Sequence, residues 1–301
     1  MSLRIVYRGS LSSCNYACAY CPFAKTRAGR EQLRQDKTQL QRFCGWVGRQ
    51  GDPLRLLFTP WGEALIWPWY QQALTWLSRR PLVRSVAIQT NLSGPLAWLA
   101  QADTAKITLW ASYHPDEVSL DAFVAQCKQV LAAGARLSAG AVGIKQHFGL
   151  IEELYRRLPA TASFWVNACK DEKDYYSAQD VAFLRRLDPF FEINLRDHPS
   201  AGKPCFSGET VFTVDGTGDM RRCHFIEQPI GNLYRQDYRQ ALKARPCTNQ
   251  VCACYLGYIH LKELDFSRRF GPGYFERYRA RGECPGACAG DARHGYGAAS
   301  S

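Results

Sequence analysis

Apolar and polar residues alternate along the first two thirds of the chain in a way that predicts strands followed by helices. Short apolar runs rich in β-branched residues are typical of buried strands, and apolar residues every three or four positions are typical of amphipathic helices. The predicted strands cover residues 3–8, 54–59, 83–90, 105–111, 136–144 and 162–167. The predicted helices cover residues 31–49, 67–78, 95–101, 119–133, 148–158 and 177–187.

Six strand–helix units with short connections predict a parallel sheet with helices outside it. The pattern alone leaves open a doubly wound sheet and a complete or partial barrel of the TIM type. In each of these architectures the chemistry gathers at the carboxyl ends of the strands. The loops that follow the predicted strands carry cysteines and polar residues, so we expect a site at this end of the sheet.

Composition indicates a globular protein, with 301 residues, of which 46% are hydrophobic and 22% are charged. This length suffices for one large domain and one small one. The chain has no apolar run long enough for a signal peptide or a membrane span, so we expect a cytoplasmic protein without a membrane partner. The net charge of +11 is spread over short pairs at predicted helix ends and turns, so nucleic acid is not the expected partner.

The thirteen cysteines are unevenly placed along the chain. Three lie between residues 14 and 21, seven follow residue 200, and Cys44, Cys127 and Cys169 stand alone as expected small buried hydrophobes. A long chain with its own core favours metal ligation over a disulfide scaffold. Three thiolates at close spacing can ligate three irons of a 4Fe-4S cube and leave the fourth open to a small molecule.

The motif Cys14-x3-Cys18-x2-Cys21, with Tyr20 before its last cysteine, resembles the signature of the radical S-adenosylmethionine superfamily. The resemblance implies a partial (β/α)6 barrel of the TIM type, which agrees with the six predicted units. It also implies a 4Fe-4S cluster on these three cysteines and S-adenosylmethionine as cofactor. In that family the cluster reductively cleaves the cofactor, and the resulting 5′-deoxyadenosyl radical abstracts a hydrogen atom from the substrate.

Further site residues are implied by the same resemblance. Gly62 and Glu63 resemble the family's Gly-Gly-Glu segment, which receives the methionine ammonium, although Trp61 replaces its first glycine. Asn91 and Ser112 occupy the places of polar contacts to the ribose and the methionine carboxylate, with a turn or cap role as the alternative. The remaining expected cofactor contacts are Tyr20, Val142, Gly143, Ile144 and Asn167. His114 is interpreted as a turn residue, with a substrate contact as the alternative.

The pattern between residues 210 and 222 predicts a β-hairpin, with Cys205 and Cys223 on either side of it. Zinc is one candidate for the later thiols. With the amino-terminal motif, however, the arrangement resembles the auxiliary-cluster domains called SPASM or, in their shorter form, twitch. We therefore expect at least one auxiliary 4Fe-4S cluster on Cys205, Cys223 and two of Cys247, Cys252 and Cys254, with Cys252 and Cys254 preferred. Cys284 and Cys288 would complete a second cluster, exchange disulfides or have no role.

The expected domains are a barrel over 1–200, an auxiliary-cluster domain over 201–290 and a disordered tail over 291–301. The expected function is that of a radical S-adenosylmethionine enzyme that oxidises or cross-links a peptide or a small polar metabolite. Its electron donor would be a protein such as flavodoxin or ferredoxin. Candidate bases follow the sixth strand: Lys170, Asp171, Glu172 and Asp174. The alternative is a non-catalytic zinc or iron-sulfur protein that binds RNA.

Overall fold

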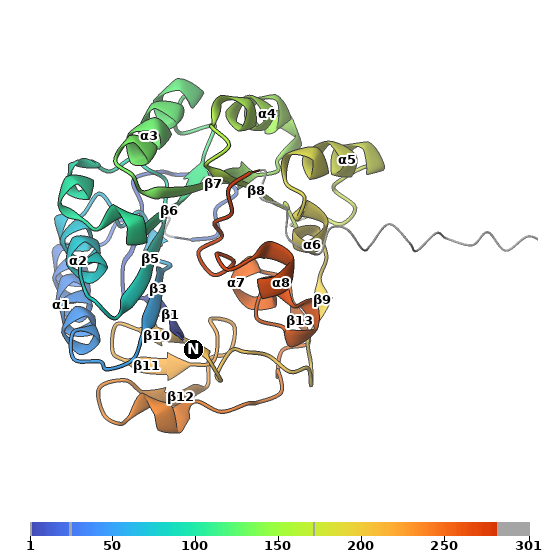
Figure 1. Cartoon of the computed structure of the whole chain (residues 1–301). Coiled ribbons are helices and arrows are strands. Elements are labelled where there is room, and N and C mark those ends of the chain that lie inside the picture. The colour runs from blue at the N-terminus through green and yellow to red at the C-terminus, as the bar shows by residue number, and fades with distance from the viewer. Residues whose placement is uncertain (1, 24–25, 171, 282–301) are drawn as a thin grey trace, which may run out of the picture.

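The computed structural model describes residues 2–23, 26–170 and 172–281, and its main element is a curved nine-stranded sheet (Figure 1). Six strands run in chain order: β1 (Leu3–Arg8), β3 (Leu54–Phe58), β5 (Val83–Thr90), β6 (Ile107–Tyr113), β7 (Arg136–Val142) and β8 (Ser163–Asn167). Three more extend the sheet beyond β1: β10 (Val211–Asp215), β11 (Asp219–Arg221) and β12 (Pro229–Asn232).

The helices of the barrel lie on the outer face of this sheet (Figure 1). They are α1 (Arg30–Val47), α2 (Pro68–Ser78), α3 (Leu120–Ala132), α4 (Phe148–Arg157), α5 (Ala178–Leu187) and the short α6 (Phe191–Leu195). Ser119 and Ser177 cap the starts of α3 and α5, as their positions in the sequence predict. Single 3-10 turns cover Ala97–Gln101, Thr104–Lys106, Lys145–His147, Tyr238–Ala241 and Lys262–Leu264. The turn over Thr104–Lys106 explains why β6 begins two residues later than the sequence predicts.

The partial barrel predicted from the sequence is confirmed. The pairs β1–β3, β3–β5, β5–β6, β6–β7 and β7–β8 are all parallel. The strands follow chain order without the reversal that marks a doubly wound sheet, so that alternative is wrong. Within the described residues β8 and β12 are the two edges of the sheet and do not pair, so the arc stays open.

The predicted hairpin is present, because β10 and β11 pair antiparallel, but it does not stand apart from the barrel. β10 pairs in parallel with β1 over five residue pairs, which continues the barrel sheet. The predicted domain boundary at residue 200 therefore falls where the chain returns to the sheet, and it stays a prediction.

The concave face of the sheet is covered by the carboxyl-terminal part of the chain. The short helices α7 (Tyr255–Tyr258) and α8 (Phe266–Phe270) lie inside the arc of strands (Figure 1). Their aromatic side chains form one core cluster with inward residues of the sheet, including Trp110 and Trp165. Near the amino ends of the strands, the buried Glu276 forms an ion pair of 2.8 Å with Arg55. This packing leaves the carboxyl ends of the strands as the accessible end of the barrel.

No helix in the described ranges is both long enough and apolar enough to span a bilayer. Residues 284, 288 and 291–301, for which the sequence suggested a second cluster and a disordered tail, lie outside the described residues.

Candidate functional site

The loop that carries the three amino-terminal cysteines is fixed at its start by a short parallel bridge. β2 (Ser12–Ser13) pairs with β4 (Trp61–Gly62), and the backbone N–H of Glu63 donates to the Ser13 carbonyl at 3.1 Å. Gly62 has a φ of 127°, and a Cβ at this position would lie 1.9 Å from the Ser13 carbonyl oxygen. Only glycine permits this close approach, so the bridge between β2 and β4 requires glycine at position 62.

A buried carboxylate holds the chain between β1 and the cysteines. Asp36 on α1 is fully buried. It accepts hydrogen bonds from the Leu11 backbone N–H, the Trp69 indole N–H and the Tyr70 hydroxyl, each at 3.0 Å. A buried carboxylate with three donors is well satisfied, so Asp36 acts as an anchor for the segment that leads into the cysteine loop.

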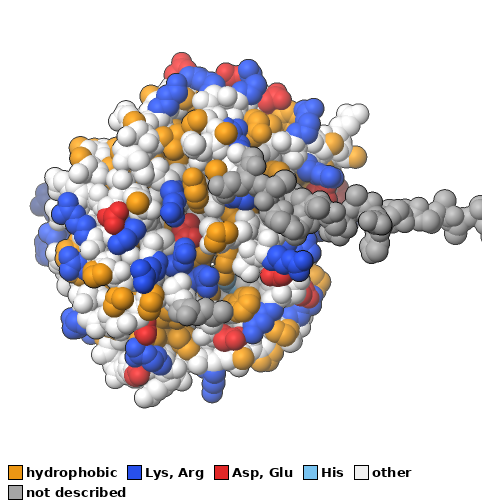
Figure 2. Space-filling model, in the orientation of Figure 1, with side chains coloured by type: hydrophobic (Ala, Val, Ile, Leu, Met, Phe, Trp, Pro, Cys, Tyr) orange, Lys and Arg blue, Asp and Glu red, His pale blue; other side chains and the backbone are white. Residues whose placement is uncertain are grey.

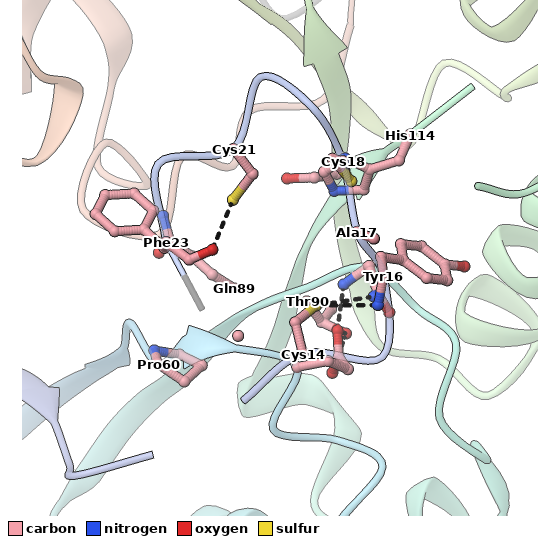
Figure 3. A pocket seen from close by; sticks show the side chains of 14 residues that line it. Cys14, Tyr16, Ala17, Cys18, Cys21, Phe23, Pro60, Gln89, Thr90 and His114 are labelled. Carbon is pink, nitrogen blue, oxygen red and sulfur yellow. Dashed lines mark hydrogen bonds between the residues drawn. The ribbon is translucent and has the colours of Figure 1, made fainter. Parts of the chain in front are cut away.

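Cys14, Cys18 and Cys21 line one cavity of about 180 Å³ at the carboxyl ends of the strands. Figure 3 shows these three side chains on a single loop around the opening. The cavity is also lined by four predicted cofactor contacts from the neighbouring strand ends, Gly62, Glu63, Asn91 and Ser112, and by Tyr16, Phe23, Gln89, Thr90 and His114. The structure thus brings the cysteine motif and four of the nine expected cofactor contacts to one place.

Cys14 makes only long contacts to the rest of the protein. Cys14 Sγ accepts from the Tyr16 backbone N–H at 3.5 Å, and the Asn91 amide nitrogen lies 3.9 Å away. Burial, with a smaller effect of Glu117, raises the pKa of Cys18 to about 12. Such a thiol is protonated at neutral pH until a metal ion displaces the proton. The donor set therefore fits a metal cluster that ligates thiolates.

The turn after β6 holds the cysteine loop from the other side. His114 Nδ1 lies 3.3 Å from Cys18 Sγ and 2.8 Å from the Tyr20 hydroxyl, and Glu117 accepts from the Ala17 backbone N–H at 2.9 Å. Burial lowers the pKa of His114 to about 4, so the ring is neutral at physiological pH. The sequence did not predict these contacts, because nothing in it links residues about a hundred positions apart.

Glu63 is almost completely buried, with 1% of its surface exposed. Its carboxylate accepts from the Leu65 backbone N–H at 2.8 Å, from the Thr90 hydroxyl at 2.9 Å and from the Asn91 backbone N–H. Burial raises the pKa of Glu63 to about 7 against these three donors. Its contacts within the protein thus fasten the end of β5 to the turn after β3, beside the place where the resemblance expects an ammonium group.

The other expected cofactor contacts lie away from this cavity's lining. Val142 and Ile144 lie at the end of β7, Gly143 accepts from the Tyr176 hydroxyl at 2.7 Å, and the Tyr20 ring stacks on His114. The Asn167 side chain accepts from Arg277 at 2.8 Å. Asn91 lines the cavity but also accepts from the Ser93 backbone N–H at 2.9 Å, which is the turn role that the sequence left open.

The candidate bases do not line the cysteine cavity. Lys170 donates to the carbonyls of Arg196 and Ala253 at 3.1 and 3.0 Å and pairs with Asp197 at 3.2 Å. Three acceptors suit an ammonium group rather than a free base. Glu172 and Asp174 are exposed and line a separate surface hollow of about 340 Å³, while Asp171 lies outside the described residues.

The later cysteines are assembled by contacts between distant segments. β9 (His198–Pro199) pairs antiparallel with β13 (Val251–Cys252), which places Cys252 beside the segment that leads to Cys205. The Arg222 guanidinium donates to the Arg245 carbonyl at 2.9 Å and to that of Pro246. The Cys247 backbone N–H donates to the Lys203 carbonyl at 3.0 Å. These contacts draw Cys223 and Cys247 toward Cys205.

The later cysteines affect one another's pKa values, and Cys254 is also affected by three cations. Burial, followed by the charges of Cys205 and Cys247, raises the pKa of Cys223 to about 11. Burial, followed by all four of the other cysteines, raises the pKa of Cys252 to about 12. Burial also raises the pKa of Cys254, but there it is opposed by the positive charges of Arg277, Arg8 and Lys170. Cys254 therefore faces cations of the barrel interior.

Among the described residues no three His, Cys, Asp or Glu side chains converge on a position for a single metal ion. In a 4Fe-4S cube each thiolate ligates a different iron. The sulfur atoms of such a site need not converge on one point, so both groups of thiols remain compatible with clusters.

No family model matches the chain, and neither does any curated protein sequence. Solved structures do match. Streptococcus suis SuiB is 17% identical with a TM-score of 0.52, and the match covers 80% of this chain and 65% of SuiB. Native anSMEcpe with bound AdoMet, which is S-adenosylmethionine, is 12% identical with a TM-score of 0.50, and the match covers 79% of this chain and 82% of anSMEcpe. SuiB has also been solved with S-adenosylmethionine bound, at the same identity and TM-score.

This chain spans 65% of the length of SuiB. At these identities the likeness establishes the arrangement of strands and helices. The chain thus has the partial-barrel fold of SuiB and anSMEcpe, which is the fold that the resemblance of its cysteine motif implies.

Proposed function

We propose that this protein is a radical S-adenosylmethionine enzyme that oxidises or cross-links a peptide or a small polar metabolite. The observation that carries the proposal is the shared cavity of Cys14, Cys18 and Cys21 with Gly62 and Glu63. Cysteines at this spacing would hold a 4Fe-4S cluster. When bound, the cluster and S-adenosylmethionine would supply the radical that removes a hydrogen atom from the substrate.

The protein's own residues would shape and protect this site. His114 and Glu117 hold the cysteine loop, and Glu63 fastens the two strand ends beside it. A site that reacts by radicals must hold its reactants in place and exclude water. These contacts provide the rigid support that this chemistry needs.

An auxiliary 4Fe-4S cluster on Cys205, Cys223 and two of Cys247, Cys252 and Cys254 is the second part of the proposal. The mutual influence of these thiols supports it. The sequence alone preferred Cys254 over Cys247, and the cations around Cys254 agree with that preference, because positive charge stabilises a thiolate. Gly257 leaves room for the Cys252 thiol, because a Cβ there would lie 2.5 Å from Cys252 Sγ.

A peptide is the substrate class that the comparisons favour. SuiB has been solved with its precursor peptide SuiA, and anSMEcpe with the Cp18Cys peptide. The electron needed to cleave S-adenosylmethionine would come from a small redox protein such as flavodoxin or ferredoxin. A base that removes a proton after oxidation stays a prediction for Lys170, Asp171, Glu172 and Asp174.

The decisive experiment is anaerobic reconstitution with iron and sulfide, followed by iron counting and incubation with dithionite and S-adenosylmethionine. We expect about eight irons and release of 5′-deoxyadenosine. Joint replacement of Cys14, Cys18 and Cys21 by alanine should leave about four irons and abolish the product. Cys44→Ala, which removes a thiol of helix α1, is the matched control and should change neither readout.

Iron counting on single cysteine variants can also identify the ligands of the auxiliary cluster. Of Cys247→Ala and Cys254→Ala, the variant whose iron content falls toward four per chain identifies the fourth ligand, and the other should keep about eight irons. A colourless protein that binds zinc and releases no 5′-deoxyadenosine would refute the enzyme and favour the alternative of a non-catalytic metal protein.

A further inference from the structure

Arg8 is the last residue of β1 and directly precedes the loop that carries the cysteines. Its Nε donates to the Thr59 carbonyl at 3.0 Å, and its guanidinium carbon lies 5.4 Å from the centre of the Trp61 ring. Trp61 is the residue that departs from the family's Gly-Gly-Glu segment. Here it provides a flat aromatic surface, 43% exposed, that orients the guanidinium.

Arg8 forms no ion pair with a carboxylate of the described residues, and the acidic group whose charge affects its pKa there is the Cys254 thiol. Its strand neighbour Asp215 pairs instead with Arg221 at 2.8 Å. Only the Nε of Arg8 makes a hydrogen bond within the described residues, so the two terminal nitrogens remain available. Burial lowers the pKa of Arg8 to about 10, which reflects how poorly its charge is solvated. A half-buried arginine without a carboxylate partner is unfavourable, and such local conflicts are typical of binding sites.

The position of Arg8 links the two groups of cysteines. Thr59, which holds its Nε, also contacts His224 at 3.1 Å, next to Cys223. The positive charges of Arg277 and Arg8 both favour the thiolate form of Cys254 by lowering its pKa. Trp61 stacks on Phe23, which lines the cysteine cavity, with ring centres 5.7 Å apart. Figure 2 shows Lys and Arg side chains beside hydrophobic ones across the middle of the face turned to the viewer.

We propose that Arg8 binds a carboxylate of the substrate between the two groups of cysteines, so that the substrate is an acidic peptide. The inference rests on the proposed function for the identity of the site. Two free terminal nitrogens in a planar fork match a carboxylate in bidentate geometry. Trp61 and Phe23 would pack on apolar parts of the same peptide.

The test uses the reconstituted holoenzyme and three decapeptides with amidated carboxyl ends, in which glycine alternates with Glu, Gln or Lys. Binding is measured by calorimetry at about 0.3 M salt, which suppresses the general attraction of a basic protein for acidic peptides. The Glu peptide should bind at least about tenfold more tightly than the Gln peptide, as a charged hydrogen-bonded pair implies. Arg8→Gln should abolish this preference, and Arg8→Lys should restore part of it.

Arg34→Gln is the matched control, because it removes the same charge from an exposed position on α1 and should keep the preference for Glu. The proposal is overturned if the wild type shows no Glu preference or if Arg8→Gln retains it. It is also overturned if Arg8→Gln weakens S-adenosylmethionine binding by the same factor, since the bound carboxylate would then belong to the cofactor. Release of 5′-deoxyadenosine without peptide tests the proposed function separately.

Discussion

Replacement of Gly62 by alanine is the sharpest perturbation of the cysteine site. The added Cβ would lie 1.9 Å from the Ser13 carbonyl oxygen, whereas contacts of this kind below 3.0 Å are essentially never seen. The bridge between β2 and β4 must therefore open by about 1 Å. This movement would break the hydrogen bond of 3.1 Å from the Glu63 backbone to Ser13.

The size of the effect follows from these contacts. Alanine at positive φ is unfavourable by about 1 to 2 kcal/mol, and loss of the hydrogen bond adds about 1 kcal/mol. Because the displaced segment carries Cys14, the larger consequence is for activity. A misplacement of about 1 Å in a catalytic site can reduce turnover by about 10²-fold.

Gly202→Ala is the matched control. Gly202 also has a positive φ, of 75°, but a Cβ there meets no atom within 4 Å. Both variants would be reconstituted, and the release of 5′-deoxyadenosine and the midpoint of chemical denaturation would be measured. We expect similar losses of stability to within about 1 kcal/mol, with turnover reduced only in Gly62→Ala. Equal turnover in the two variants would refute the steric explanation.

Three further predictions concern the anchors of the site and of the barrel interior. Asp36→Ala leaves three hydrogen-bond donors without an acceptor, so it should lower the free energy of unfolding by about 3 kcal/mol or more. The control, Asp121→Ala at an exposed site, should change the free energy of unfolding by less than about 0.5 kcal/mol. The pKa of Glu63 is raised from 4.5 to about 7, so its contribution to the free energy of unfolding is present below pH 4.5 and is lost as the pH rises through 7. Glu63→Gln should remove this part of the pH dependence, measured by denaturation of the apoprotein at several pH values. Arg277→Met loses the hydrogen bond to Asn167 and three contacts with aromatic rings, so it should lower the free energy of unfolding by about 2 kcal/mol. The control, Arg268→Met on α8, should leave the free energy of unfolding unchanged within error.

The strands and outer helices could be predicted from the sequence because each carries its own local signal. The apolar runs of β3 and β5, for example, are buried on both faces, and their boundaries agree with the prediction to within one residue. Ser177 and Asp180 similarly form the capping box that marks the start of α5. Such features depend on neighbouring residues alone, so a single sequence contains them.

The contacts that complete the site depend on residues far apart in the chain. His114 and Glu117 hold the cysteine loop across about a hundred positions, and the sequence pattern gives no sign of it. Arg222 likewise gathers the later cysteines through backbone carbonyls, which any residue type supplies. Motif spacing therefore predicts which thiols belong to a site, whereas their supports emerge only from the fold.

The parallel pairing of β10 with β1 makes the barrel and the later cysteines mutually dependent. Without residues 201–281, β1 would become an exposed edge, and the inner face, including Trp110 and Trp165, would lose its cover of aromatic side chains. Unpaired edges and large apolar patches promote aggregation. We therefore expect a fragment of residues 1–200 to lack a cooperative unfolding transition, measured by circular dichroism under denaturant beside the full chain. A fragment that unfolds cooperatively, with hydrogen-exchange protection of β1 equal to that of the full chain, would show that the barrel is an independent domain and that the two sites are joined only by the chain between them.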